Sequence, residues 1–408
     1  MDTKAMTCVI IGASHGGVNC AFNLRKEGWE GAIILYDADS HLPYHRPPLS
    51  KTFLTSDDAI EKHSLKAAES YDKAGIALRL GEKVATIDRE AKTITTASGT
   101  SQPYDKLVLA TGARPFVPPI AGLAQAANVH VLRTAEGVLG IREALKAKPR
   151  QAVIIGGGYI GLEIAASLRK LGLDVTVLER EARLLPRVTS PEMSTFFAEL
   201  HAANGTTIAC SKNVSKITTD AVHCADGSTY AADLIIVGVG IRVNTELATA
   251  AGLKTTNGIV VNEQTQTNDP DVYALGDCTL HHSKHYNRPV RLESVQNAVD
   301  QAKVTAASIC GKEACYDSIP WFWSDQYDAK LQMVGLSEGY TQVILRDEPG
   351  EGLKKSAWYF KGDELLAVDA VNNAKAYVLG TKFIKDRISV NKENLANTEL
   401  PLKPGNLV

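Results

Sequence analysis

A tetrapeptide that occurs twice constrains the fold of this chain more than any other feature of its sequence. Val9-Ile10-Ile11-Gly12 returns as Val153-Ile154-Ile155-Gly156, 144 residues later. Each copy opens the same order of patterns: a short all-apolar strand, a glycine-rich turn, a helical pattern, and a second apolar strand that ends in an acidic residue. Continuous apolar strands between amphipathic helices indicate a parallel sheet that is buried on both faces. The sequence therefore predicts an α/β protein with two βαβ units.

The expected elements of the two copies match closely. They are a helix at His15–Glu27 and a strand at Ala32–Tyr36 in the first copy, and a helix at Tyr159–Leu171 and a strand at Asp174–Leu178 in the second copy. A glycine, Gly28 or Gly172, ends each helix, as is common at helix C-termini.

The second glycine turn has the complete G-x-G-x-x-G spacing of a dinucleotide-binding turn. Gly156 allows the tight turn from strand to helix, Gly158 lets a pyrophosphate approach the backbone, and Gly161 lets helix and strand pack closely. The helix N-terminus offers unpaired N–H groups to the phosphates. Glu179 follows the first glycine by 23 residues, and there it can accept hydrogen bonds from a ribose diol. This copy predicts a dinucleotide site.

The first glycine turn departs from that spacing. It reads Gly12-Ala13-Ser14-His15-Gly16-Gly17, with Ser14 in the place of the second glycine. Serine is small, and we expect it to fit with a slight shift of the chain. Asp37 or Asp39 is the candidate ribose acid. One such turn can be a plain turn without a ligand, but two copies in matched strand–helix–strand–acid contexts favour a pair of nucleotide sites.

Three further strands run into glycine turns. Lys106–Leu109 precedes Thr111 and Gly112, Leu234–Val239 precedes Gly240, and an apolar strand that begins at Val272 ends at Gly276-Asp277. Open α/β sheets bind their ligands at such strand ends, although any one of these could be an ordinary turn.

Composition limits the class of protein. In 408 residues, 44 Lys and Arg stand against 46 Asp and Glu, for a net charge of −2. The length predicts two or three domains, and the near-neutral balance argues against a general nucleic-acid binder. No apolar run is long enough to cross a membrane. The cysteines, of which there are 7, form neither a disulfide framework nor a zinc site. We expect no nucleic-acid partner, no membrane partner, no metal site and a reducing, cytoplasmic location.

Three longer motifs resemble one family. They are Leu42-Pro43-Tyr44-His45-Arg46-Pro47-Pro48-Leu49-Ser50-Lys51, Arg291-Leu292-Glu293-Ser294-Val295-Gln296-Asn297-Ala298 and Pro320-Trp321-Phe322-Trp323-Ser324-Asp325-Gln326. Together with the two glycine turns, they are similar to those of the FAD-dependent pyridine-nucleotide reductases. Within that family they resemble the ferredoxin reductases that serve Rieske oxygenases and bacterial haem-thiolate monooxygenases, the putidaredoxin-reductase-like group.

The resemblance implies two cofactors, FAD and NAD(H), and a set of residues for each. The FAD set is Gly12, Ser14, His15, Gly16, Gly17, Asp37, Arg46, Lys51, Thr111, Gly112, Asp277, Val295 and Trp323. The NAD set is Gly156, Gly158, Tyr159, Ile160, Gly161, Glu179 and Gly240.

The resemblance also implies a catalytic pair. Lys51, on a segment stiffened by Pro47 and Pro48, matches the family lysine beside the flavin N5, and Glu163 matches the glutamate that pairs with it. A cation there favours the negative charge that reduction leaves on the flavin ring. The alternatives are a surface lysine and a first-turn helix acid.

The expected activity follows from the same resemblance. NADH gives a hydride to FAD, and the reduced flavin passes single electrons to a two-iron–two-sulfur ferredoxin that feeds an oxygenase. The cysteine pairs and the single cysteine of the disulfide-reducing members are absent at the matching positions, so electrons must leave the flavin directly. Trp323 is expected near the flavin ring, or else in a core.

A basic stretch after Asp277 is the expected ferredoxin contact, or alternatively a solvated loop. It consists of His281, His282, Lys284, His285, Arg288 and Arg291.

We expect three domains: an FAD-binding domain at residues 1–114 and 242–318, an NAD-binding domain at 115–241, and a C-terminal α+β domain at 319–408. The alternatives are an NADH oxidase or rubredoxin reductase of the same fold, and a redox sensor like apoptosis-inducing factor.

Overall fold

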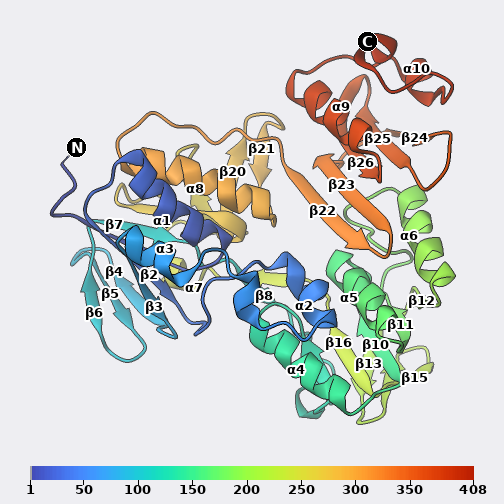
Figure 1. The fold of residues 1–408 in the computed structure, drawn as a ribbon, viewed down its shortest axis with the longest axis horizontal. Helices are drawn as coiled ribbons and strands as arrows, with labels where there is room; N and C mark the ends of the chain where they lie inside the picture. The colour runs from blue at the N-terminus through green and yellow to red at the C-terminus, as the bar shows by residue number, and fades with distance from the viewer. Residues whose placement is uncertain (1) are drawn as a thin grey trace. The chain divides into compact units, whose positions relative to one another are not determined.

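A computed structural model describes residues 2–408 of the chain. Its contacts divide the chain into two compact units, each built from three segments. Unit 1 consists of Met1–Arg46, Asp58–Arg114 and Ile241–Ser318, and unit 2 consists of Pro47–Asp57, Pro115–Gly240 and Ile319–Val408. Figure 1 follows these segments by colour along the chain.

Unit 1 is organised around a five-stranded parallel sheet in the order β19–β7–β1–β2–β3. Its strands are β1 (Thr7–Ile11), β2 (Ala32–Asp37), β3 (Ile76–Leu80), β7 (Lys106–Leu109) and β19 (Val272–Ala274). Neighbouring residues of β1 enter different cores, because side chains alternate between the faces of a strand. Ile10 packs in one core with Leu24, and Val9 packs in the other with Leu107.

Helices cover this sheet, and small sheets extend the unit. α1 (His15–Glu27) packs against α8 (Val295–Ile309), as Figure 1 shows. The other helices are η2 (Ile60–His63), α3 (Ala68–Lys73), α7 (Glu246–Ala250) and η4 (Gly276–Cys278). The other strands are β4 (Val84–Asp88), β5 (Thr93–Thr96), β6 (Ser101–Pro103), β8 (Ala113–Pro115), β17 (Ile241–Val243), β18 (Ile259–Val261), β20 (Thr279–Ser283) and β21 (Arg288–Val290).

Unit 2 contains a second five-stranded parallel sheet, in the order β12–β11–β10–β16–β9. Its strands are β9 (Val129–Val131), β10 (Gln151–Ile155), β11 (Asp174–Leu178), β12 (Thr207–Ala209) and β16 (Leu234–Val237). A three-stranded antiparallel sheet packs on it and consists of β13 (Val214–Ile217), β14 (Ala221–Cys224) and β15 (Thr229–Ala231). The helices of this part are η1 (Pro47–Ser50), α2 (Thr52–Thr55), η3 (Leu123–Gln125), α4 (Ala135–Lys146), α5 (Tyr159–Lys170) and α6 (Pro191–Ala203).

The rest of unit 2 is a five-stranded antiparallel sheet with helices on it. The strands run in the order β22–β23–β26–β25–β24. They are β22 (Trp321–Gln326), β23 (Ala329–Gly335), β24 (Gln342–Asp347), β25 (Lys355–Lys361) and β26 (Glu364–Val371). α9 (Ala374–Lys385) packs on β26 and β23, and α10 (Lys392–Ala396) and α11 (Pro404–Leu407) follow it.

The predicted fold class is confirmed: two parallel, Rossmann-like sheets and a C-terminal α+β part. The repeated tetrapeptide forms the end of β1 and its turn in one sheet, and the end of β10 and its turn in the other. The expected strand Leu234–Val239 is shorter in the structure: β16 ends at Val237, and the chain turns at Gly240, which has φ +114°. In the C-terminal part, β25 and β26 form a hairpin, with Gly362 in its turn at φ +56°.

Candidate functional site

The turn after β1 has the tight geometry that its glycines predict. Gly12 has φ +109°, and a Cβ there would overlap the carbonyl of Ala110. A Cβ on Gly17 would overlap the carbonyl oxygen of Gly12, because α1 passes close to the strand end. Both overlaps are with backbone, so neither can be relieved by moving a side chain. The turn therefore needs glycine at both positions.

The acidic residue that ends β2 reaches this turn. Asp37 Oδ2 accepts from the backbone N–H of Ala13 at 2.5 Å, and Oδ1 accepts from the N–H of Asp39 at 2.8 Å. Asp39 instead turns to its own loop and accepts from Tyr44 Oη at 2.7 Å. Of the two acids considered as ribose ligands, Asp37 is the one that the structure brings to the glycine turn.

The turn after β10 repeats this geometry. Gly156 has φ +111°, and a Cβ on Gly161 would overlap the Gly156 carbonyl oxygen. Glu179 Oε2 accepts from Gly157 N–H at 2.7 Å, as Asp37 does from Ala13. At Gly158, a Cβ would meet no atom within 4 Å, so the space beside this backbone is open. That opening is where a pyrophosphate would approach the backbone.

Ser14 holds the place of Gly158 in the first turn. It is the N-cap residue of α1, and its side chain makes no capping hydrogen bond. Arg46 donates from Nε to Ser14 Oγ at 3.3 Å and lies over the Tyr44 ring, 4.6 Å from its centroid. A cation therefore lies at the N-terminus of α1, which suits the phosphates of a dinucleotide.

Two further segments end at the same edge of the unit 1 sheet. β7 lies next to β1, and β19 lies on the other side of β7. The carboxyl end of β7 leads to Thr111-Gly112, and that of β19 leads to Gly276-Asp277. Thr111 Oγ1 donates to the carbonyl of Asn244, and Gly276 N–H donates to Gln301 Oε1, each at 2.7 Å. Val295 begins α8, which follows the N-cap Ser294. The carboxyl edge of a doubly wound sheet is where its ligands bind.

Lys51, which is partly exposed, and the buried Glu163 form an ion pair within unit 2. Lys51 Nζ lies 2.8 Å from Glu163 Oε2, and the Glu163 side chain is only 2 % exposed. Lys51 is the N-cap residue of α2, directly after η1, and Glu163 lies on α5. The structure thus brings the two predicted catalytic residues together from positions 112 apart in the sequence.

Sequence reasoning missed two further partners of this carboxylate. Ser50 Oγ donates to Glu163 Oε2 at 2.5 Å, and Ser324 Oγ donates to Oε1 at 2.7 Å. Ser324 and Gln326 lie two residues apart on β22, so they share one face of the strand. This period-two placement of polar residues in an aromatic-rich motif marks Ser324 as a candidate site residue, but nothing in the sequence links it or Ser50 to Glu163.

Trp323 lies on β22 and is half-buried among aromatic rings. Its ring centroid is 5.4 Å from that of Trp321 and 6.5 Å from that of Phe322. Tyr159, at the start of α5, packs against Phe322 at 5.2 Å and donates to Met333 Sδ. Ile160 beside it is 44 % exposed. The position of Trp323 beside a flavin stays a prediction.

The basic stretch after Asp277 is less basic than its sequence implies. Its residues form the β20–β21 hairpin. His281 is buried against Tyr316, and burial lowers the pKa of this imidazole to about 4, so it is neutral at pH 7. Lys284 is paired with Glu263 at 2.5 Å, and Arg291 with Glu293 at 2.6 Å. The expectation of a charged contact is therefore wrong for His281.

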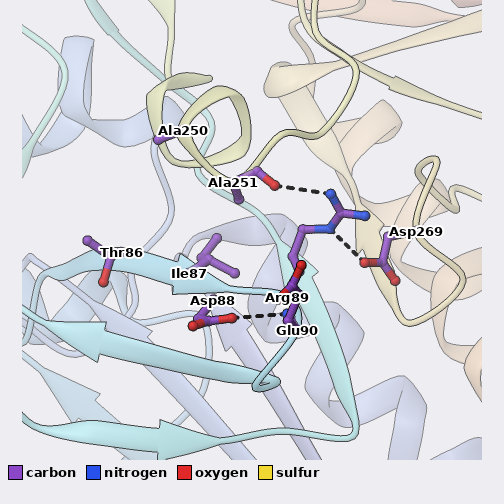
Figure 2. Close-up of a pocket in the computed structure, with 8 residues that line it drawn as sticks. All are labelled: Thr86, Ile87, Asp88, Arg89, Glu90, Ala250, Ala251 and Asp269. Carbon is purple, nitrogen blue, oxygen red and sulfur yellow. Dashed lines mark hydrogen bonds and ion pairs between the residues drawn. The ribbon is translucent and has the colours of Figure 1, made fainter.

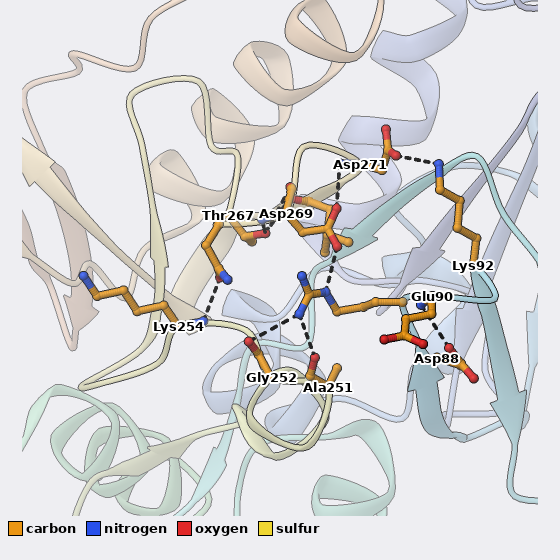
Figure 3. A network of polar contacts seen from close by, with 12 residues as sticks. Asp88, Glu90, Lys92, Ala251, Gly252, Lys254, Thr267, Asp269 and Asp271 are labelled. Atoms are coloured by element: carbon orange, nitrogen blue, oxygen red, sulfur yellow. Dashed lines mark hydrogen bonds and ion pairs between the residues drawn. The ribbon is translucent and has the colours of Figure 1, made fainter.

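A cavity of about 560 Å³ lies in unit 1 away from the predicted residues. It is lined by Thr86, Ile87, Asp88, Arg89, Glu90, Ala250, Ala251 and Asp269 (Figure 2). Arg89 pairs with Asp269 at 2.7 Å and donates to the carbonyl of Ala251. Close by, Lys92 pairs with Asp271 (Figure 3). These cations join the segment 58–114 to the segment 241–318, so this network is structural.

Comparisons with known proteins agree with this geometry. Residues 6–302 match the family described as pyridine nucleotide-disulphide oxidoreductase, and residues 321–405 match a family described as reductase C-terminal. The chain belongs to the pyridine nucleotide-disulphide oxidoreductase family. It is therefore an oxidoreductase, and its cofactors are FAD and a nicotinamide dinucleotide, as predicted.

Several of its relatives are ferredoxin reductases. Putidaredoxin reductase of Pseudomonas putida is 44 % identical over 97 % of this chain and 95 % of its own length. Rhodocoxin reductase of Rhodococcus erythropolis is 40 % identical over 98 % of this chain and 94 % of its own. Among solved structures, the covalent putidaredoxin reductase–putidaredoxin complex contains a chain that matches with a TM-score of 0.93 and 42 % identity, covering 98 % of this chain and 97 % of that one. The resemblance drawn from the motifs is confirmed.

Two further findings concern helix length and the cysteines. In residues 2–408, no helix combines the length and apolar character that a membrane crossing requires. The cysteines of this part of the chain are free thiols, including the C-x4-C pair Cys310 and Cys315.

Proposed function

We propose that this chain is an NADH-dependent ferredoxin reductase that transfers electrons through FAD to a two-iron–two-sulfur ferredoxin, which in turn feeds an oxygenase. Relatives named for putidaredoxin, for rhodocoxin and for ferredoxin support the acceptor. An anthranilate 1,2-dioxygenase system reductase, 36 % identical over 97 % of this chain, supports the oxygenase.

The observation that carries the proposal is the ion pair between Lys51 and the buried Glu163, which stands where relatives have a redox cysteine. The resemblance implies that disulfide-reducing members of the family have a cysteine near the position of Leu49 to Lys51. This chain has none there. Without a thiol relay, the electrons of the flavin have to leave it directly. One-electron carriers fit that route, and one NADH, which yields two electrons, then reduces two ferredoxins.

The residues divide the work in the following way. We assign the turn after β1, Asp37 and Asp277 to FAD, in a domain of residues 1–114 and 242–318. We assign the turn after β10 and Glu179 to NADH, in a domain of residues 115–241. The unit boundaries after Arg114, Gly240 and Ser318 support these limits, although the contacts place residues 47–57 and 319–408 in the same unit as residues 115–240. We assign residues 319–408 to a third domain because they form a sheet of their own.

The bound flavin supplies the change from two-electron to one-electron chemistry, and the protein supplies position and charge. Lys51 would place a cation where negative charge develops on reduction, and such a charge is stabilised more strongly in a site that excludes water. Glu163 holds that cation by an ion pair. The backbone N–H groups at the N-termini of α1 and α5 would hold the pyrophosphates.

The activity is tested with the FAD-loaded protein, NADH and a two-iron–two-sulfur ferredoxin. We expect two ferredoxins reduced for each NADH, and slow oxygen uptake when ferredoxin is left out. Rapid oxygen uptake without ferredoxin would instead make the chain an oxidase. Rubredoxin belongs in the same assay, since a rubredoxin–NAD(+) reductase of Pseudomonas putida is 36 % identical over 91 % of this chain.

The role of the cation is tested by Lys51→Met. Removing the charge leaves the reduced flavin uncompensated, so we expect stopped-flow reduction by NADH to slow by about ten-fold or more and the flavin potential to fall. Lys62→Met, which removes an exposed lysine paired with Asp58, is the control and should behave as the wild type. Wild-type rates in Lys51→Met would remove this residue from the mechanism.

We also place the chain in the cytoplasm. Its free thiols, several of them buried, suit a reducing compartment. Fractionation of the native host with antibodies against the chain tests this location.

A further inference from the structure

Glu163 is a buried carboxylate that needs partners on both oxygens. Oε2 accepts from Lys51 Nζ at 2.8 Å and from Ser50 Oγ at 2.5 Å. Oε1 accepts from Ser324 Oγ at 2.7 Å. A buried charge is costly unless its lone pairs are satisfied. The lysine balances the charge, and Ser324 supplies the hydrogen bond that Oε1 takes.

The direction of each hydrogen bond beyond Ser324 is fixed by chemistry. The hydroxyl proton of Ser324 goes to Glu163, so its oxygen accepts from Gln326 Nε2 at 3.2 Å. This turns Gln326 Oε1 toward His201 Nε2, 3.0 Å away. An amide oxygen only accepts, so the imidazole carries its proton on Nε2. All the donors therefore point toward Glu163.

The tautomer requires a neutral imidazole, and His201 is fully buried on α6. Burial lowers the pKa of its imidazole, and the hydrogen bond with Gln326 acts in the opposite direction. His201 Nδ1 has no hydrogen-bond partner within residues 2–408, as expected of a neutral ring that donates only from Nε2. The ring edge packs on Tyr327, with centroids 5.1 Å apart, which fixes the plane of the imidazole.

The hydrogen-bonded residues Ser324, Gln326 and His201 lie on a regular strand and helix, whereas Lys51 does not. Ser324 and Gln326 lie on β22, whose six residues are all paired with β23. Lys51 is an N-cap residue between two single-turn helices. A side chain on a short segment is held less firmly than one on a paired strand. Ser324 therefore transmits the order of the sheet to Glu163, and through it to Lys51.

We propose that Ser324 and Gln326 are positioning residues for the reduction of the flavin by NADH: with His201 they hold the Glu163 carboxylate in one orientation, and Glu163 in turn aims Lys51. The inference rests on the proposed function, since it concerns the hydride step of that reaction. It gives a physical purpose to the Ser and Gln of the Trp321–Gln326 motif.

The first test compares Ser324→Ala with Ser324→Thr, which keeps the hydroxyl. We expect Ser324→Ala to lower the limiting rate of stopped-flow flavin reduction by about five- to ten-fold, as for the loss of one hydrogen bond to a charged group. The KM for NADH should stay unchanged, and Ser324→Thr should recover at least half of the lost rate. Ser356→Ala, a buried serine of the same sheet that bonds Trp358, is the matched control and should keep the wild-type rate.

A double-mutant cycle then asks whether Ser324 acts through Glu163. In the Glu163→Gln background, Ser324→Ala should slow reduction by less than two-fold, because the charge that it supports is gone. Should Ser324→Ala lower flavin content, Gln326→Met, expected to slow reduction by about two- to three-fold, takes its place in the cycle. Equal slowing in both backgrounds overturns the inference, as does a wild-type rate in Ser324→Ala.

These outcomes separate the inference from the proposed function. If the wild-type protein fails to reduce ferredoxin with NADH, the proposed function fails. If it reduces ferredoxin and the Ser324 variants behave as the wild type, only the positioning role fails.

Discussion

At the scale of single residues, the acid at the end of β2 and the acid directly after β11 make the same hydrogen bond to a glycine turn. Asp37 and Glu179 each accept from the first backbone N–H after the leading glycine, Ala13 and Gly157 respectively. Each acid thereby fixes the turn before any nucleotide arrives. An acid fixed beside the turn can also accept from a ribose hydroxyl, so one carboxylate contributes both to the fold and to recognition.

The charge of Glu179 predicts a preference for NADH, because it repels a 2′-phosphate. The nearby cations are engaged: Arg180 pairs with Glu181 at 2.8 Å, and Arg183 donates to the carbonyl of Pro186. In Glu179→Gln we expect kcat/KM for NADPH relative to NADH to rise by about ten-fold. Glu181→Gln is the control, with an unchanged ratio expected. Steady-state kinetics with both nucleotides measure this, and an unchanged ratio in Glu179→Gln would contradict the assignment.

Asp369 predicts how stability depends on pH. Burial raises the pKa of this carboxyl to about 6, while hydrogen bonds from Tyr359 and Thr189 act in the opposite direction. A folded-state pKa above the ordinary 3.8 means that the acid form is favoured by folding. The contribution of Asp369 to the free energy of unfolding is fully present below about pH 4 and is lost as the pH rises through about 6.

Asp369→Asn should remove that dependence. At pH 8 we expect the variant to be more stable than the wild type by about 1–2 kcal/mol, with the advantage vanishing near pH 4. Thermal unfolding across this pH range measures it, and Asp328→Asn, at an exposed position, should show no such trend. A constant difference between variant and wild type at all pH values would sink the argument.

At the scale of elements, Gly158 and Gly161 in the turn after β10 have different reasons to be glycine. A Cβ on Gly161 meets the backbone of Gly156, whereas a Cβ on Gly158 meets nothing. Gly161→Ala should therefore lower the Tm by several degrees, since about 1 kcal/mol shifts Tm by 2–4 °C at domain sizes of 150–250 residues. Gly158→Ala should keep the Tm and raise the KM for NADH. The reverse pattern would show that the open space serves no ligand.

Elements were predicted well where short-range patterns determine them. The bounds of α1 and β11 match the expectation residue for residue, because glycine stops and apolar runs are local signals. The partners of Glu163 were missed, because Ser50 and Ser324 come from segments 113 and 161 residues away and no local signal joins them. The burial of His281 was missed for a similar reason: the contact of its ring is with Tyr316.

At the scale of the whole molecule, unit 1 is a split domain held together by charge. Arg89 pairs with Asp269, and both Lys92 and Lys106 pair with Asp271, each at 2.6 or 2.7 Å. These pairs join chain segments separated by the residues 115–240 of unit 2. Partly buried, multiply bonded pairs of this kind contribute more than isolated surface pairs. The sequence located the insertion by its repeat, but it could not show which charges close the split.

The net charge of the chain is only −2, so its overall field attracts a protein partner weakly. Electrostatic steering of such a partner therefore depends on local clusters of charge. In the basic hairpin, two of the cations are paired with acids and His281 is neutral, and the guanidinium of Arg288 lies 6.0 Å from the Tyr286 ring centroid. At about 0.15 M salt the Debye length is about 8 Å, so exposed charges across a forming interface are partly screened. If ferredoxin docks on this hairpin, its reduction should slow as ionic strength rises, by up to about ten-fold.

Arg288→Glu tests the hairpin directly. It should raise the apparent KM for ferredoxin at low salt and leave the KM for NADH alone, because only the acceptor meets this charge. Ferricyanide, a small acceptor, should follow a different salt curve in both proteins, and Arg180→Glu serves as a matched charge reversal at an exposed position of unit 2. Unchanged ferredoxin kinetics in Arg288→Glu would move the docking surface elsewhere, with Lys330 and Lys382 of the C-terminal part as the next positions to reverse.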